Sequence, residues 1–228
     1  AEAQMIRLKK YAEFAAALGS PYLHHTVINE IYNPENVLPR KEELFYKGID
    51  AAREIYDYAE KFGVKCIIED QGFIYNGVEG FGRFLREVNR DIGIVADFGN
   101  IRQVEEKIAD LIRAFPEKIA HVHVKDVYVL PEQKGGGLPT VNGNFMYGTL
   151  FRQGDVGFDD AMRALHDIGY KGYFTFESGN ILLPSGKRRP YPQDERLLRA
   201  PLDLRIKAEA FLYEIGKSVL TAYDCFEE

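Results

Sequence analysis

The sequence has few cysteines, no long apolar run and no excess of basic residues. Its two cysteines, Cys66 and Cys225, lie far apart, and Cys66 sits within an apolar stretch. We therefore expect no disulfide framework, and we expect a cytoplasmic location. No run is long enough to span a membrane and no signal peptide is evident, so we expect no membrane partner. The formal net charge of -6 argues against a nucleic-acid partner, because nucleic-acid-binding proteins usually carry a basic face.

The composition is that of a globular protein, with 46% hydrophobic and 28% charged residues in 228. Short apolar runs alternate with segments whose apolar residues recur at helical spacing. Strict alternation of this kind predicts an α/β fold with a parallel sheet. The expected strands are residues 21–27, 65–69, 93–97, 119–124 and 172–177. The expected helices are residues 1–18, 44–62, 81–88, 104–115, 158–165 and 204–219.

The strand expected at residues 119–124 has an unusual second face. Its alanine and valines alternate with His121, His123 and the following Lys125, so these three polar side chains point the same way. An ordinary core strand would not bury two imidazoles and an ammonium, because unpartnered buried polar groups are costly. A barrel strand can carry them when that face opens into a polar site at its C-terminal end.

Three other expected strands end on an acid, at Glu69, Asp97 and Glu177. Because the strands are parallel, these acids and His123 would meet at one edge of the sheet. Three carboxylates and an imidazole suit a divalent ion, with Mn²⁺ favoured by the mixed oxygen and nitrogen ligands and Mg²⁺, Co²⁺ or Zn²⁺ as alternatives. Any one acid alone would more simply cap a helix or pair with a surface lysine. Four groups in the same register favour a metal site.

Four segments together resemble the xylose-isomerase-like TIM-barrel superfamily. They are IIEDQG around Glu69, VADFGN around Asp97, HVHVKD at 121–126 and GDVGFDDAMRALHDIGYKGYFTFE at 154–177. This superfamily contains sugar isomerases, epimerases and endonuclease-IV-like proteins. The resemblance implies that residues 1–228 form a single domain of the TIM (β/α)8 type.

The same resemblance implies roles for individual residues. In the ketose 3-epimerase branch the metal ligands would correspond to Glu69, Asp97, His123 and Glu177, and the two glutamates would also form the acid/base pair. Two positions depart from that branch. Asn100 stands where the branch has histidine, and Val129 stands where it has arginine.

A further departure concerns the number of strands. The family barrel has eight, whereas five are expected here, and the first resembles the fourth of the family. The chain therefore resembles the last five βα units, a partial TIM barrel. We expect longer sequence, another subunit or oligomerisation to complete the barrel along the edge at residues 21–27, because an open sheet would expose a strand edge.

The leading functional hypothesis is a metal-dependent isomerase or epimerase that moves a proton beside the carbonyl of a small-molecule sugar. Glu69 and Glu177 would exchange the proton. His24 or His25 could act as a base, and Lys125 could hold a substrate oxygen or pair with Asp126. One alternative is a lyase that acts on a sugar derivative such as a C-glycoside. The others are a DNA-repair enzyme of the endonuclease-IV type, disfavoured by only five histidines, and a non-catalytic subunit.

Two long loops are expected at residues 127–154 and 178–200. Both follow strands that carry site residues, so both could cover the site. In the second loop, Lys187, Arg188 and Arg189 would either grip a phosphate or form a solvated basic surface, and the solvated surface is favoured. His166 is expected on the surface of a helix.

Overall fold

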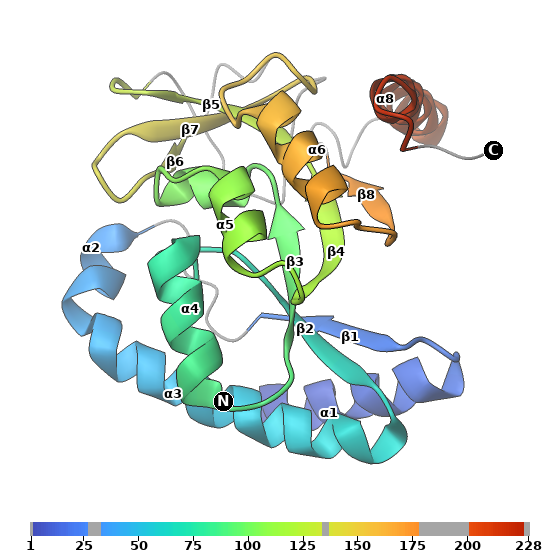
Figure 1. Cartoon of the computed structure of the whole chain (residues 1–228). Helices are drawn as coiled ribbons and strands as arrows, with labels where there is room; N and C mark the ends of the chain where they lie inside the picture. The colour runs from blue at the N-terminus through green and yellow to red at the C-terminus, as the bar shows by residue number, and fades with distance from the viewer. Residues whose placement is uncertain (1, 27–32, 134–136, 178–200, 226–228) are drawn as a thin grey trace.

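The computed structural model describes residues 2–26, 33–133, 137–177 and 201–225. Its centre is a five-stranded parallel sheet that forms a half-barrel, in the order β1-β2-β3-β4-β8 (Figure 1). The strands are β1 Tyr22–His25, β2 Lys65–Glu69, β3 Gly93–Asp97, β4 Ile119–Val124 and β8 Phe174–Phe176. The α/β fold, the partial TIM barrel and its five parallel strands are thus confirmed.

Helices follow the strands in the predicted order. They are α1 Glu2–Ala17, α2 Pro34–Val37, α3 Lys41–Ala59, α4 Gly77–Val88, α5 Ile108–Ala114, α6 Phe158–Asp167 and α8 Leu202–Thr221, with short 3-10 turns η1 Leu38–Arg40, η2 Glu60–Phe62 and η3 Asn100–Gln103. Two predicted helix starts were wrong by four residues, because α4 begins at Gly77 rather than at residue 81 and α5 begins at Ile108 rather than at residue 104. Glu105 adopts φ +59°, in the left-handed region, and interrupts the helix there. His166 lies on α6 with 87% of its side chain exposed, as predicted.

The core lies between the sheet and the helices. On α3, the residues spaced at three and four positions are buried, from Phe45 and Ile49 to Ile55 and Ala59. The helix-facing side chains of the strands, such as Ile68 and the two valines of β4, belong to the same core. Because one face of each strand packs against the helices, the alternate side chains of the strand must point to the inside of the half-barrel.

Part of the predicted long loop at residues 127–154 forms a second sheet. Strands β5 Asp126–Leu130, β6 Leu138–Pro139 and β7 Phe145–Thr149 pair antiparallel in the order β5-β7-β6, at the top of Figure 1. Tyr128 and Tyr147 stack across β5 and β7, with ring centroids 5.4 Å apart. Lys125 is the one residue between β4 and β5, so this sheet continues directly from the site-bearing strand. The second predicted loop, residues 178–200, lies outside the described residues.

The last residue of HVHVKD anchors the segment that leads into α6. The Asp126 carboxylate accepts hydrogen bonds from the backbone N–H groups of Val127 (2.9 Å) and Gly154 (3.0 Å). A Cβ atom at position 154 would collide with Asp126 Oδ1 and with the carbonyl oxygen of Val127. This packing gives a physical reason for finding HVHVKD and the GDVGF segment together in one sequence.

Both ends of the parallel sheet are edges. Within the described part of the chain, no strand pairs with the outer side of β1 or of β8. The adjoining helix α1 packs on α3 and β1 but exposes several large apolar side chains, among them Ile6 and Phe14. Among the described helices, none is long and apolar enough to cross a membrane.

We expect the outer edge of β1 to be covered in the working protein, by further βα units or by another subunit, because an exposed strand edge invites pairing. Residues 1–228 alone should therefore self-associate in sedimentation velocity. The outward-facing backbone amides of β1 should exchange rapidly with solvent in dilute solution, where the monomer predominates. They should become protected when the chain self-associates or when additional βα units or a partner is supplied. A stable monomer whose β1 amides stay exposed would contradict this expectation.

Candidate metal centre

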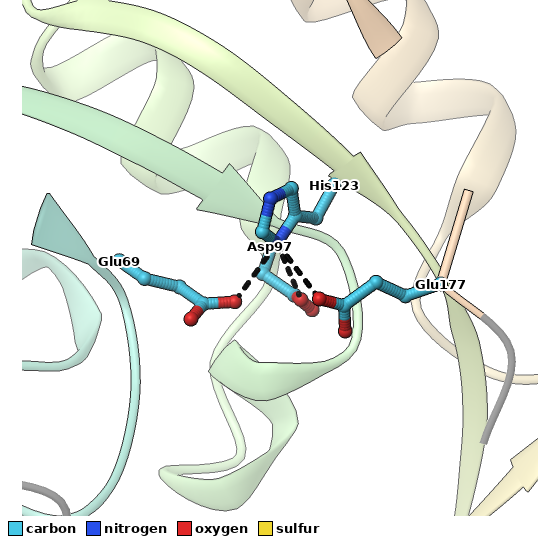
Figure 2. A group of neighbouring side chains, drawn as sticks. All are labelled: Glu69, Asp97, His123 and Glu177. Carbon is cyan, nitrogen blue, oxygen red and sulfur yellow. Dashed lines mark hydrogen bonds and ion pairs between the residues drawn. The ribbon is translucent and has the colours of Figure 1, made fainter. Parts of the chain in front are cut away.

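Four side chains converge at the C-terminal edge of the parallel sheet. Glu69 ends β2, Asp97 ends β3, His123 lies in β4 and Glu177 follows β8. One ligand atom from each lies within 4.8 Å of every other (Figure 2). The structure therefore brings together the four residues that the sequence pointed to as a metal-ligand set.

Strand register explains how they meet. Asp97 pairs with His123, and His123 pairs with Thr175 two residues before Glu177. The backbone N–H of Glu177 donates to the Val124 carbonyl (2.9 Å), which extends the alignment one residue past β8. Each of these side chains directly follows an apolar residue that lies in the core or packs against it, so alternation points the polar set into the half-barrel.

His123 lies at the middle of the cluster, between the two glutamates in Figure 2. Its Nδ1 atom is 3.0 Å from Glu69 Oε1, 3.1 Å from Glu177 Oε1 and 3.6 Å from Asp97 Oδ2. Burial alone would lower the pKa of this imidazole, but hydrogen bonds to the three carboxylates raise it to about 11.

The two glutamates respond in the opposite sense. Burial would raise the pKa of Glu69, but hydrogen bonds from His123 and His24 bring it down to about 2. The pKa of Glu177 is also lowered, since His123 and Lys125 outweigh the effect of its burial. Both carboxyl groups are therefore ionised near neutral pH in the metal-free protein.

Lys125 supplies a second cation. Its ammonium lies 2.6 Å from Glu177 Oε2 and 2.9 Å from Asp97 Oδ2. Burial opposes the charge, but these two carboxylates prevail and raise the pKa of the lysine. The predicted alternative, a pair with Asp126, was wrong, because the Asp126 carboxylate accepts backbone N–H groups instead.

Polar groups around the ligands hold their carboxylates in place. Asp97 Oδ1 accepts hydrogen bonds from the backbone N–H groups of Gly99 and Asn100, each at 2.8 Å. The side-chain amide of Asn100 donates to Glu69 Oε1 at 3.0 Å. The sequence singled out Asn100 only as a departure from the epimerase branch, whereas the structure shows that it bridges two of the four ligands.

Asp70 is a neighbour that the sequence analysis missed. Its side chain is fully buried, and Oδ1 accepts the backbone N–H of Asp97 at 2.6 Å. Burial and the nearby Asp97 carboxylate raise the pKa of Asp70 well above its ordinary value. The available signal was the acid pair Glu69-Asp70 at the end of a strand, where alternation sends the second side chain to the other face.

The two candidate histidines of β1 point in different directions. His24 Nε2 lies 3.6 Å from Glu69 Oε2, and its ring lies edge-on to His123 with centroids 5.4 Å apart. His25 alternates with it and is buried, and burial lowers its pKa to about 4. The geometry places His24, not His25, beside the cluster. A catalytic role for His25 stays a prediction.

The residues fit a divalent ion. Ligand atoms about 2.0–2.2 Å from a metal lie at most roughly 4.4 Å from one another. The observed upper separation of 4.8 Å would close with side-chain shifts of a few tenths of an ångström. Carboxylate and imidazole donors suit Mn²⁺, Mg²⁺ and Zn²⁺. In that state His123 would bind as the neutral imidazole.

Comparisons of the sequence with known proteins match one protein family and two curated relatives. A family model described as a xylose isomerase-like TIM barrel matches residues 1–200. A Bacillus subtilis (strain 168) protein named inosose isomerase is 29% identical over 141 residues, which cover 60% of this chain and 48% of that protein. The chain spans about half the length of the curated relatives that it matches, 48% of one and 57% of another.

Solved structures show the same fold. A structure described as IOLI protein with a binding zinc atom has a TM-score of 0.65 and 20% identity, over 98% of this chain and 70% of that one. A D-allulose 3-epimerase from Methylomonas sp. has a TM-score of 0.58 and 22% identity, over 91% of this chain and 68% of that one.

Metal binding at this centre should release a proton from His123, because the metal-free imidazole is protonated up to a pKa of about 11 and a ligand imidazole is neutral. Below that pKa, raising the pH favours the metal-bound state. The logarithm of the Mn²⁺ association constant should therefore rise by about one per pH unit near neutrality.

Titration calorimetry in buffers of different ionisation enthalpy would measure the released proton, with one ion expected per chain. His166→Gln, on the exposed face of α6, is the control and should leave the proton count unchanged. A pH-independent affinity without proton release would count against this arrangement.

Proposed function

The chain belongs to the xylose isomerase-like TIM barrel family, and from that premise we propose that it acts as a divalent-metal-dependent sugar isomerase or epimerase. The relatives that support this proposal are an inosose isomerase and a D-allulose 3-epimerase. The reaction would transfer a proton at the carbon beside a carbonyl of a small-molecule sugar. Mn²⁺ is the proposed ion, with Mg²⁺, Co²⁺ and Zn²⁺ as alternatives.

One observation carries the proposal, namely that the two glutamates flank the cluster from opposite sides. Glu69 comes from β2 and Glu177 follows β8, with Asp97 and His123 between them (Figure 2). A substrate carbon held against the centre would meet a carboxylate on each face. That arrangement suits removal of a proton from one face and its return to the other.

Each side chain has a task in this scheme. The metal would be held by the four ligands Glu69, Asp97, His123 and Glu177. When bound, it would act as a Lewis acid and stabilise negative charge that develops on substrate oxygens. One glutamate would accept the proton from the substrate carbon, and the other would donate a proton to it. His24, whose Nε2 lies 3.6 Å from Glu69 Oε2, would exchange that proton with Glu69.

Other reaction classes remain as alternatives with distinct products. A lyase acting on a sugar derivative such as a C-glycoside would start from the same proton abstraction but release a leaving group. A DNA-repair enzyme would cleave abasic DNA, and a non-catalytic subunit would turn over neither sugar nor DNA. Metal content, sugar product analysis and an abasic-DNA cleavage assay separate these classes.

Glu177→Gln tests the acid/base role. The substitution keeps size and one oxygen donor but removes the basic site. At saturating Mn²⁺ we expect turnover to fall by about 10²–10⁴-fold, the usual contribution of a general acid or base. Exchange of the substrate hydrogen with solvent, followed by NMR in deuterated water, should fall in parallel.

Glu117→Gln is the matched control, because Glu117 is exposed in the turn before β4, at the opposite end of that strand from the centre. It should retain full turnover. Near-normal turnover of a metal-loaded Glu177→Gln protein would refute the acid/base role of Glu177 and shift attention to His24, His25 or Lys125.

A further inference from the structure

Lys125 is built into the carboxylate cluster rather than aimed at open solvent. Its side chain is 18% exposed, and its ammonium contacts Asp97 Oδ2 and Glu177 Oε2. The stem of the lysine passes over Gly99, where an added Cβ would lie 2.6 Å from Lys125 Cγ. The glycine therefore leaves the space that the lysine needs to reach the two acids.

The contacts also divide the carboxylate oxygens into two sets. Glu177 Oε2 pairs with Lys125. Its other oxygen, Oε1, lies 3.1 Å from His123 Nδ1 and faces the other candidate metal ligands. Asp97 Oδ1 accepts hydrogen bonds from two backbone N–H groups, and Oδ2 faces Lys125 and the centre. Lys125 would thus leave Oε1 of Glu177 as the oxygen that is free to hold a metal.

Charge is the second consequence. The ligand set holds three carboxylates, and His123 would bind a metal as a neutral group. We propose that Lys125 is a positioning residue that offsets one of these three negative charges, so that the centre matches a dication and disfavours a trication. The inference rests on the proposed metal site and adds a reason for its selectivity between ions of different charge.

The alternative role, in which the ammonium binds a substrate oxygen, is less consistent with the contacts. Both neighbouring carboxylates already bind the ammonium at 2.6 and 2.9 Å. A substrate oxygen would have to displace one of them. Removing a buried charge from its partners is expensive, so the ion pairs define the resting position of the lysine.

The test compares Mn²⁺ with Lu³⁺, two ions of similar radius, by titration calorimetry on the wild-type chain and on Lys125→Met. Coulomb energy scales with the charge of the ion, so a tenfold gain in Mn²⁺ affinity on losing the lysine implies a gain of about thirtyfold for Lu³⁺. The ratio of the Lu³⁺ to the Mn²⁺ association constant should therefore rise about threefold or more.

This ratio is the decisive quantity, because a purely structural disturbance of the ligands would weaken both ions together and leave it unchanged. Lys125→Arg keeps the charge and should keep the wild-type ratio. Lys118→Met removes a lysine that pairs with Asp91 at the far end of β4, and it should also leave the ratio unchanged. Thermal melts confirm that each variant is folded before titration.

The outcomes separate the two proposals. If the wild-type chain binds neither ion, the metal site itself is refuted. If the wild-type chain binds Mn²⁺ but Lys125→Met keeps the wild-type ratio, whether or not both affinities fall, the charge-matching role of Lys125 is overturned.

Discussion

Repulsion between like charges is the constraint on which the candidate centre depends. Parallel pairing carries Glu69, Asp97 and Glu177 to one edge of the sheet, where burial strengthens the repulsion between carboxylates. The protonated His123 and Lys125 oppose it from within the cluster, and backbone and amide donors around Asp97 and Glu69 add to their effect. Without a metal, the centre therefore already contains the cations that allow three acids to share a small space.

Much of the framework is readable from the sequence, because it depends on short-range periodicity. Apolar residues at a period of two or 3.6 predicted the five parallel strands and most of the helices, as on α3. An acid at the end of three strands and His123 in HVHVKD were enough to place the ligand set at one edge. Alternation along a strand is a local property, and the parallel direction was inferred from the order of strands and helices along the chain.

What escaped prediction depends on contacts between distant segments. The β5-β7-β6 sheet forms only through pairing between segments separated along the chain, so its short strands resembled a loop. One of the two partners of Lys125, Glu177, is set by where β8 ends, whereas the local sequence offered Asp126. Choosing between His24 and His25 required the register of β1 to one residue, since a shift by one reverses which side chain faces the centre.

The close approach of Gly99 to the stem of Lys125 links the evolution of two positions that follow different strands, β3 and β4. A lineage that replaced Gly99 by a larger residue would expel the lysine before any change at position 125 itself. A lineage that first lost the lysine would be free to fill the space at position 99. The order of the two substitutions then determines whether an evolutionary path passes through a protein with an uncompensated acidic centre.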